Sequence, residues 1–299
     1  ARPQKNLVKL CRTSHGSDMR PLLTAFSRVT PPAATLTPVA RASLPTMLAA
    51  LPPAWAWYDY CTAVYLALTA VSLALKPDEV AKVTPWSKFA QGYQFKTPCS
   101  ARTGMLVKYL LALSLSGWWA ISAGGLQVMP ALMLVHFGKR CIEVVCVHDF
   151  SGSPTEELST CSFISAFYTM VAWLFLRAGV HTEPTVAALG LAVFAVGQLG
   201  NLFHHLLLAR LRRSGKQQVQ KYVVPEGGLF NLVSCPHYLF EVLSWAGAAI
   251  AAMTVHTWLV AAWVAGMLGG RAKVTTDWYR TKFGKSYPSS RKHIVPYVF

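Results

Sequence analysis

The sequence predicts an all-α integral membrane protein, a bundle of about seven transmembrane helices with a basic N-terminal extension. Two features of the composition favour this class. Hydrophobic residues make up 53% of the chain and charged residues only 13%, whereas a typical soluble domain is roughly 25% charged. Several apolar runs also approach the ~20 residues that a helix needs to cross a bilayer. We therefore expect most of the formal net charge of +16 to lie in loops.

The positive charge and the cysteines limit the kinds of partner and ligand. The charge fits anionic lipid headgroups and a phosphate-bearing ligand. No nucleic-acid-binding motif accompanies it, so membrane lipids are expected partners and nucleic acid is not. The seven cysteines contain no CxxC pair and are odd in number, which predicts neither a disulfide framework nor a zinc site. No metal ligands are therefore assigned.

The N-terminal residues 1–55 differ in composition from residues 56–299, which form the predicted bundle. Residues 1–45 carry several Lys and Arg residues against one acid, Asp18, and are rich in Ser, Thr and Pro. Such a basic, acid-poor stretch resembles an organelle transit sequence. We expect it to be retained as an ordered arm that contacts protein partners or, as the alternative, packs on its own bundle.

The predicted helices follow the apolar runs in order. A polar loop, 76–102, ends the first run and is too charged to cross a membrane. The long run 104–138 is divided near Gly124 and Gly125, and the Pro-Glu-Gly-Gly segment at 225–228 also interrupts helix. The predicted spans are 57–75, 105–122, 127–148, 163–180, 185–211, 231–253 and 256–272, with six spans as the alternative if the first lies on the surface.

Basic residues near the ends of the spans predict the orientation. The turn 210–221 and the tail 271–299 lie on one side in this topology, and both are rich in Lys and Arg. The positive-inside rule therefore places the C-terminus on the cytosolic or matrix side. The basic N-terminal arm then lies on the opposite side, against the rule, and we give more weight to the short flanking loops.

Polar side chains recur at helical spacing inside these apolar runs. Residues three or four apart share one face of a helix, and ionisable side chains within spans usually face a bundle interior or a cavity. Singly, such a histidine is often only hydrogen-bonded in the core, and a Lys–Glu pair is often only an ion pair. Four stripes together favour a polar cavity. They are Asn201, His205, Leu208 and Arg212; His237, Tyr238, Glu241 and Trp245; His136, Lys139 or Arg140, and Glu143; and Arg271, Thr275, Trp278 or Tyr279, and Lys282.

The residue types of these stripes indicate what the cavity holds. Arg and Lys at its mouth suit phosphates, and Tyr and Trp offer surfaces on which a planar ring stacks. No GxGxxG follows a predicted strand, and the chain has no P-loop, GxSxG or HExxH element, which excludes the usual nucleotide-binding and hydrolase motifs. We expect an amphipathic, phosphate-bearing cofactor and an apolar substrate that enters laterally from the lipid.

Several sequence blocks occur in a fixed order in the C-terminal half of the chain. They are Gly200–His205, Val224–Phe230, Ser234–Tyr238 with Glu241 and Trp245, Trp278–Tyr279, Tyr287–Lys292 and Pro296–Phe299. Together they resemble the C-terminal domain of the steroid 5α-reductase family. That family includes 3-oxo-5α-steroid 4-dehydrogenases, polyprenol reductase and very-long-chain trans-2-enoyl-CoA reductase. The resemblance is strong over 130–299, weaker over 84–130, where it is to plant and algal members, and absent over 1–55.

The resemblance implies a seven-helix bundle that binds NADPH inside the membrane. Such an enzyme reduces a carbon–carbon double bond conjugated to a carbonyl in a lipid, such as an enoyl-CoA or a steroid. Tyr238 falls where enoyl-CoA reductases carry a catalytic tyrosine, and its phenol suits a proton donor. His136 is a possible helper, and Tyr109 falls where steroid reductases carry a carboxylate. The implied cofactor-binding residues are Asn201, His205, Arg212, Tyr222, His237, Glu241, Arg271 and Tyr279.

Some positions depart from the family pattern. The cofactor contacts are largely kept, whereas the residues that clamp a steroid carbonyl are not. The departures are Tyr109 in place of an acid, Phe137 in place of the tyrosine of a His-Tyr pair, His205 in place of an acid, His237 in place of an asparagine and Thr275 in place of a histidine.

Three functional hypotheses follow. The first is an NADPH-dependent membrane reductase acting on a lipid. The second is a catalytically silent family member that serves as a structural subunit of a membrane complex, for example in mitochondria. The third is an isoprenylcysteine-type methyltransferase, against which the blocks Pro225–Phe230 and Tyr287–Lys292 favour the reductase. The resemblance predicts the endoplasmic reticulum, whereas the arm predicts the mitochondrial inner membrane.

Overall fold

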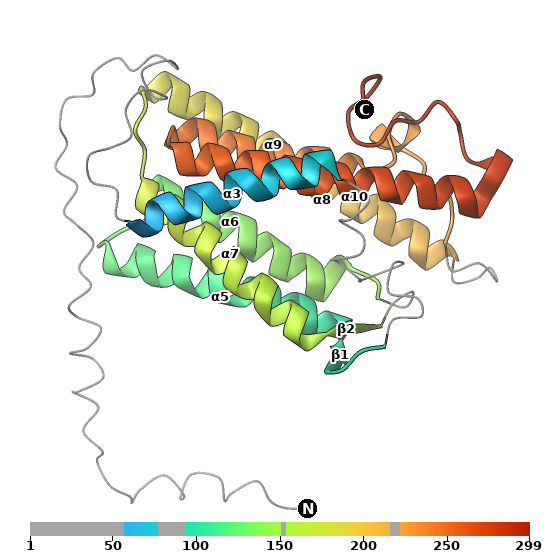
Figure 1. Ribbon diagram of the computed structural model, residues 1–299, viewed down its shortest axis with the longest axis horizontal. Helices are drawn as coiled ribbons and strands as arrows, with labels where there is room; N and C mark the ends of the chain where they lie inside the picture. Colours follow the sequence, from blue (N-terminus) through green and yellow to red (C-terminus); the bar gives the residue numbers. More distant parts are fainter. Residues whose placement is uncertain (1–56, 77–93, 151–153, 216–221) are drawn as a thin grey trace, which may run out of the picture. The chain divides into compact units, whose positions relative to one another are not determined.

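The computed structural model describes residues 57–76, 94–150, 154–215 and 222–299. These residues contain seven α-helices and one two-stranded sheet (Figure 1). The predicted arm and the boundary after residue 55 lie outside the described residues and stay predictions. The helices are α3 (Trp57–Leu75), α5 (Ala101–Ser122), α6 (Val128–Ile142), α7 (Leu158–Ala178), α8 (Pro184–Gly215), α9 (Pro236–Ala252) and α10 (Val255–Phe283), with short turns η2 (Glu143–Val147), η3 (Gly228–Asn231) and η4 (Gly284–Ser286).

Each predicted span coincides with one of these helices, which confirms the mostly helical fold. Three of them, α5, α7 and α8, are long and apolar enough to cross a membrane, and α3 is a shorter apolar helix. Helix α6 has 15 residues and α9 has 17, fewer than the ~20 of a typical span. Seven membrane crossings therefore stay a prediction.

Four predicted boundaries are wrong, one of them the start of α7, which is Leu158 rather than residue 163. The span predicted at 127–148 is α-helical only as far as Ile142, and η2 continues it as a π-helical turn. The span predicted from residue 231 begins at Pro236, because proline is favoured in the first turn, where its missing N–H has no helical partner to lose. Helix α10 continues past the predicted end at residue 272 to Phe283.

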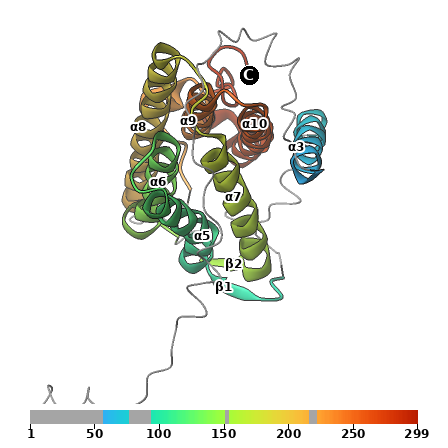
Figure 2. The same ribbon diagram turned by 90° about the vertical axis from the view of Figure 1, so that its left-hand side faces the viewer.

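The helices pack as neighbours along a few extended contacts. Helices α8 and α9 share the most extensive one, α5 packs against α6 and α7, and α10 packs against α3 and α9. Figure 2 shows α3 beside α10, with α9 and α8 beyond it. The strands β1 (Pro98–Ser100) and β2 (Thr155–Glu157) pair antiparallel. Each strand directly precedes a helix, so the small sheet joins the first turns of α5 and α7 (Figure 1).

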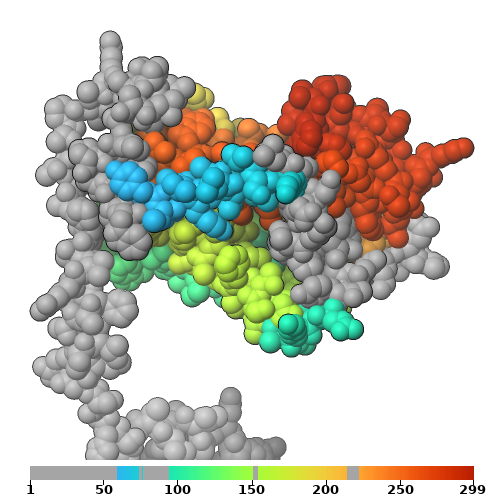
Figure 3. All heavy atoms as spheres, viewed as in Figure 1, coloured from blue at the N-terminus to red at the C-terminus, as the bar shows by residue number. Residues whose placement is uncertain are grey.

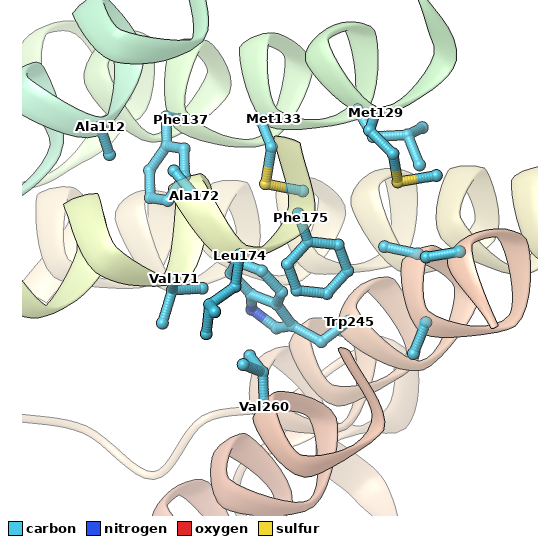
Figure 4. Close-up of a cluster of buried hydrophobic side chains, with 14 of the residues drawn as sticks. Ala112, Met129, Met133, Phe137, Val171, Ala172, Leu174, Phe175, Trp245 and Val260 are labelled. Carbon is cyan, nitrogen blue, oxygen red and sulfur yellow. The ribbon is translucent and has the colours of Figure 1, made fainter. Parts of the chain in front are cut away.

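The main hydrophobic core lies among α6, α7 and α9 (Figure 4). Phe137 and Met133 of α6 point toward Phe175 of α7 and Trp245 of α9, and all four side chains are buried. The Trp245 ring lies 5.4 Å from the Phe175 ring and 6.3 Å from the Phe137 ring, centroid to centroid. Buried aromatic rings contribute large apolar areas, so this cluster is a rigid support for the polar residues beside it.

Glycines allow the close approach of α8 and α9. A Cβ added at Gly197 would lie 2.5 Å from the Ser244 backbone nitrogen, and one added at Gly247 would lie 2.3 Å from the Phe194 nitrogen. Small residues at helix contacts let backbones approach in this way in membrane bundles. The polar residues of α8 are thereby held close to the first turn of α9.

The C-terminal tail folds back onto the segment that leads into α9. Val233 and Lys292 form a parallel β-bridge. The hydroxyl groups of Ser234 and Tyr287 lie 2.6 Å apart, and burial raises the pKa of Tyr287. Arg291, which is 4% exposed, donates to a backbone carbonyl before η3 at 2.7 Å. The tail therefore fixes the start of α9.

Helix α3 covers part of the surface, where Figure 3 shows it from blue to cyan. Val64, Leu68 and Val71 expose more than half of their surface. At one end, the buried carboxylate of Asp59 pairs with Arg177 of α7 at 3.0 Å. An anchored helix with an exposed apolar face fits contact with lipid.

Candidate functional site

A buried network of ionic and amide groups joins α6, η2 and α8. Lys139 of α6 donates to Glu143 Oε1 (3.0 Å) and to Asn201 Oδ1 on α8. Asn201 donates in turn to the main-chain carbonyl of His237, at the start of α9 (2.8 Å). Glu143 is completely buried and Asn201 is 2% exposed. Charges at this depth are costly unless they are paired and hydrogen-bonded, so the network holds three elements at one polar centre.

Arg140 is the second cation of this network. It donates to Glu143 Oε2 and lies 3.2 Å from His205 Nδ1. It also donates to the hydroxyl of Tyr109 on α5 at 3.0 Å. His205 Nδ1 lies 3.1 Å from the same Glu143 oxygen. The single carboxylate of Glu143 therefore gathers three basic side chains, those of Arg140, His205 and Lys139.

The π-helical turn η2 gives this cluster part of its geometry. The N–H of His148 donates to the carbonyl of Glu143, five residues earlier, at 2.8 Å. π-turns are rare and are found frequently at functional sites. After the turn, the His148 ring lies 5.2 Å from the His205 ring. The widened turn thus brings a second histidine to the edge of the network.

His136, predicted as a catalytic helper, lies on α6 one turn before Arg140 and is 3% exposed. Its Nε2 lies 3.5 Å from Glu241 Oε1, which also accepts from Trp245 Nε1 at 3.4 Å. Its Nδ1 lies 3.1 Å from the Nε2 of Gln198. In this amide orientation the buried Gln198 Oε1 has no hydrogen-bond partner among the described residues. A buried acceptor without a partner is costly, so this oxygen marks a place for a ligand donor.

Tyr238, the predicted proton donor, lies in the first turn of α9. The guanidinium of Arg271 on α10 hydrogen-bonds its hydroxyl, and Arg140 lies within electrostatic range of it. Arg271 is 4% exposed. The Tyr238 ring packs 4.3 Å from the His237 ring. The phenol therefore lies in the positive electrostatic field of two guanidinium groups, one from α6 and one from α10.

Tyr109, which is buried, and Tyr168, which is partly buried, stack beside Arg140. Their rings stack with centroids 5.6 Å apart and an interplanar angle of 7°. The ring of Phe137 lies 6.1 Å from that of Tyr168 and carries no hydroxyl. Tyr168 thus adds a second, partly buried phenol that the sequence did not single out.

Three predicted cofactor contacts lie farther out. Arg212 is exposed and donates to a main-chain carbonyl in the loop after η2 at 2.9 Å. Tyr279 stacks on Tyr287 with centroids 5.4 Å apart and lies within electrostatic range of Arg212. The Tyr222 ring lies 5.1 Å from the Trp278 ring. The structure therefore brings Asn201, His205 and the main chain of His237 into the buried network, and it pairs Glu241 with His136 and Arg271 with Tyr238. Arg212, Tyr222 and Tyr279 lie outside that network, among aromatic and basic side chains.

His204 has a structural role. Its Nδ1 donates to the Gly200 carbonyl at 2.7 Å, and its Nε2 accepts from the Leu229 N–H at 3.2 Å. Its ring stacks on Phe240 with centroids 5.1 Å apart. Both ring nitrogens are therefore used, and the histidine fixes the Pro225–Phe230 block to α8.

Three side chains offer atoms that could bind a metal ion, and these atoms lie within 4.8 Å of one another. They belong to Glu143, His148 and His205. Such residues are common ligands of transition metals. However, the Arg140 guanidinium already contacts both Glu143 and His205. Because a permanent cation occupies this position, we interpret the group as a charge network rather than as a metal centre.

A cavity of about 570 Å³ adjoins the network. His148 belongs to its wall and also contacts the ring of His205. Arg213 lines it and donates to the carbonyl of Cys146 at 3.4 Å. The lining residues are Ser100, Arg102, His148, Asp149, Phe150, Pro154 and Arg213.

The sequence missed several members of the site. Gln198 lies three residues before Asn201 on one helix face, and this spacing was a usable signal. Helical spacing predicts either Lys139 or Arg140 beside Glu143, yet both contact it. Tyr168 lies in an apolar helix where its neighbour at helical spacing is the small residue Ser165, so the spacing gave no charged or aromatic signal at this position.

The arrangement suits a ligand with phosphate and amide groups. Buried and outer cations bind phosphate oxygens well, and Asn201 and Gln198 supply amide groups. Tyr238, beside Arg271, is placed to donate a hydrogen bond or a proton to an oxygen that gains negative charge. The site therefore has the parts of a centre for proton transfer beside a phosphate-bearing cofactor.

Comparisons with known proteins agree with this chemistry. A family model described as 3-oxo-5-alpha-steroid 4-dehydrogenase matches residues 157–299. The chain is 32% identical over 217 residues to human 3-oxo-5-alpha-steroid 4-dehydrogenase 1, covering 67% of this chain and 80% of the relative. It is 34% identical over 169 residues to the very-long-chain enoyl-CoA reductase of Dictyostelium discoideum, covering 55% of each chain. It therefore spans only about half the length of the amoebal relative.

Proposed function

Because the chain belongs to the 3-oxo-5-alpha-steroid 4-dehydrogenase family, we propose that it is an NADPH-dependent membrane reductase. Its relatives are named as steroid dehydrogenases and enoyl-CoA reductases, which act on carbon–carbon double bonds. The proposed substrate is a lipid in which such a bond is conjugated to a carbonyl. The observation that carries the proposal is Tyr238, held by Arg271 beside the buried network of Lys139 and Asn201.

The described residues fit NADPH as the cofactor. Arg212, Arg271 and Lys139 are the candidates for its phosphates, and Asn201 is a candidate for its amide group. The buried Gln198 Oε1, which has no partner among the described residues, fits an amide N–H donor of the same kind. When bound, NADPH supplies the hydride that the β-carbon of the substrate receives.

Tyr238 is the proposed hydrogen-bond and proton donor. Hydride addition at the β-carbon shifts the electrons of the double bond toward the carbonyl oxygen, and protonation at the α-carbon completes the saturated product. A phenol aimed at that oxygen stabilises the developing charge. Arg271, which hydrogen-bonds Tyr238, places a positive charge beside the oxygen that gains negative charge. His136, paired with Glu241, is the proposed helper.

We propose an enoyl thioester rather than a 3-oxo steroid as the substrate class. Phe137 carries no hydroxyl at the position where the resemblance implies a steroid-binding tyrosine, and its ring belongs to the core. Tyr238, by contrast, is present. Leu111 of α5, Phe163 of α7 and Leu199 of α8 each expose more than half of their surface. Such apolar exposure supports contact with lipid and lateral access for an acyl chain.

The alternative of a silent structural subunit rests on the hydroxyl absent at Phe137, the acid absent at Tyr109 and the arm at residues 1–45. The arm lies outside the described residues. Protein partners that bind this arm stay a prediction. The endoplasmic reticulum, the mitochondrial inner membrane, and the cytosolic or matrix side for the C-terminus are likewise predictions. Cell fractionation and protease protection of the tail test them.

NADPH binding and NADPH oxidation by the purified protein test the proposed function. We expect binding, and oxidation with a trans-2-enoyl-CoA in preference to a 3-oxo-Δ4 steroid. Arg212→Ala should weaken binding about tenfold, the effect of one lost charge-assisted contact. Arg280→Ala removes the same charge from the far end of α10 and should bind like the wild type. Absence of NADPH binding would contradict the proposal, and binding without turnover on either substrate would favour the silent subunit.

A further inference from the structure

We infer that Cys99 and Cys161 form a redox-active cysteine pair, which hydrogen peroxide converts to a reversible disulfide. Cys99 lies in β1, and Cys161 lies in the first turn of α7. A Cβ atom built at Gly104 would stand 3.2 Å from the Cys99 sulfur and 2.8 Å from the Cys161 sulfur. Both sulfurs therefore border the same small space, which exists because Gly104 has no side chain.

The small sheet holds the two cysteines at this place. Cys99 of β1 is the partner of Glu156 in β2, and β2 leads directly into α7. Cys99 is partly buried between two exposed neighbours in its strand, whereas Cys161 is 1% exposed. A small oxidant from solution therefore reaches Cys99 first, and Cys161 is the second thiol that completes the disulfide.

Glu156 supplies the proton acceptor that the second thiol needs. The Cys161 thiol donates to Glu156 Oε2 at 3.2 Å. The ammonium group of Lys108 donates to the same oxygen at 2.7 Å, and Lys108 and Glu156 are both buried. Because the thiolate rather than the thiol is the nucleophile, a carboxylate that already accepts from the S–H group is placed to take its proton.

The oxidation proceeds in two steps. The Cys99 sulfur attacks one oxygen of hydrogen peroxide, the O–O bond breaks, and Cys99 becomes a sulfenic acid while one water molecule leaves. Cys161 gives its proton to Glu156 and attacks the Cys99 sulfur. The S–OH bond breaks, and the hydroxide takes the proton from Glu156 and leaves as the second water. The two thiols thus lose two electrons and two protons, and the peroxide is reduced to two molecules of water.

The position of the pair favours a reversible bond. Arg102, in the first turn of α5, and Arg213, in the last turn of α8, line one cavity. The sheet at the start of α5 therefore lies at the end of the bundle that carries the basic turn, for which the cytosolic or matrix side is predicted. Disulfides in reducing compartments are usually transient and redox-sensing. When formed, this bond ties β1 to α7 at the junction where α5 and α7 begin.

Disulfide mapping of the full chain in lipid nanodiscs tests this inference. The protein is treated with hydrogen peroxide, its remaining thiols are blocked, and it is digested without reductant for mass spectrometry. In the wild type, most of the oxidised Cys99 should be joined to Cys161, with a mass lower by two hydrogen atoms than that of the two reduced peptides, and dithiothreitol should separate them. Cys146→Ser, which removes an exposed cysteine, should give the same cross-link.

A dimedone-type probe, which labels sulfenic acids, tests the order of the two steps. Cys161→Ser should accumulate the label on Cys99, because no second thiol consumes the sulfenic acid. Cys99→Ser should leave Cys161 without the label. Each substitution exchanges a sulfur for an oxygen of similar shape, and unchanged thermal denaturation shows that the fold is kept.

Two results would overturn the inference. In the first, Cys99 and Cys161 of the wild type stay unlinked at a peroxide concentration that oxidises the exposed Cys146. In the second, Cys99 is joined to other cysteines as often as to Cys161. Both results are independent of NADPH binding and of turnover, so the cysteine pair stands or falls separately from the proposed function.

Discussion

At the scale of single residues, Glu143 shows how burial and charge determine structure together. It is fully buried, and its two carboxylate oxygens contact Lys139, Arg140 and His205. In a medium of low polarity, removing one charged group of such a set leaves the opposite charge of the others buried and unpaired, which is costly. The carboxylate therefore stabilises the position of all three bases.

Glu143→Gln should destabilise the protein by about 3 kcal/mol, because it leaves buried cations without their counter-charge. Thermal or denaturant unfolding in detergent measures the effect. Asp277→Asn is the matched control: Asp277 also contacts two bases, Lys273 and Arg280, but its side chain is 45% exposed. Exposed pairs contribute about 0–1 kcal/mol. Equal losses for the two variants would show that burial does not govern the Glu143 network.

Tyr238→Phe should reduce turnover at least about a hundredfold, the usual range for loss of a general acid, and leave NADPH affinity unchanged. The substitution removes one hydroxyl and keeps the ring that packs on His237. Stopped-flow NADPH oxidation, with a separate binding titration, measures both quantities. Tyr60→Phe, on the exposed face of α3, is the control. Turnover retained within a few-fold by Tyr238→Phe would exclude the phenol as proton donor.

At the scale of elements, the close contact of α8 and α9 positions the site. It brings Asn201 to the His237 carbonyl and depends on glycines that face backbone atoms. A Cβ at Gly197 would lie 2.5 Å from Ser244 N and 2.7 Å from the Phe240 carbonyl oxygen. Because both contacts are with backbone, no side-chain rotation relieves them.

Gly197→Ala should therefore destabilise the bundle by about 1–3 kcal/mol, the range for overpacked interiors, and should also lower NADPH affinity by separating α8 from α9. Gly125→Ala is the control, since a Cβ there meets nothing within 4 Å. Melting temperatures of both variants, with and without NADPH, give the comparison. A fully stable Gly197→Ala protein would mean that the helices pack less closely than the structure has them.

The small sheet gives a prediction on pH. The Thr97 hydroxyl and the N–H groups of Lys96 and Thr97 donate to Glu157, and they hold the pKa of this carboxyl below its usual value. A carboxyl whose pKa is lower in the folded state adds stability above its unfolded pKa of about 4.3 and loses it as pH falls through the folded pKa. Thr97→Val should lower the melting temperature at pH 7, and the difference from the wild type should shrink in acid.

Thr97→Ser keeps the hydroxyl and serves as the control for that measurement. It should follow the wild-type curve of melting temperature against pH. A difference between Thr97→Val and the wild type that stays constant from pH 7 to pH 3 would show that the threonine acts by packing rather than by its bond to Glu157.

At the scale of the whole molecule, the apolar runs were enough to predict all seven described helices. Two boundaries failed where the sequence stays apolar without staying α-helical, and the end of α10 failed because the helix continues through polar residues to Phe283. Val144–Val147 continues the apolar pattern of α6, yet it forms the π-turn, and residues 231–235 precede the true start of α9 at Pro236. Hydropathy reports burial, and it does not report which backbone hydrogen bonds form.

The part of the candidate site that lies on one helix face was predictable from the sequence, whereas the contacts between helices were not. Helical spacing placed Asn201 and His205 on one face, and the structure joins both to the network. Spacing within one helix gives no information on contacts between helices. The contact of Tyr109 with Arg140 depends on how α5 and α6 pack. The cavity at Arg102 and Arg213 likewise brings the start of α5 to the end of α8, which are far apart in sequence.

Transfer of deuterium from NADPH labelled on its reactive carbon to a trans-2-enoyl-CoA tests the central claim most directly. Mass spectrometry of the product locates the label. The account predicts one deuterium at the β-carbon with the wild type, and a rate lowered at least about a hundredfold with Tyr238→Phe. A saturated product without the label, or no product from any conjugated enoyl or 3-oxo-Δ4 substrate despite NADPH binding, would contradict it.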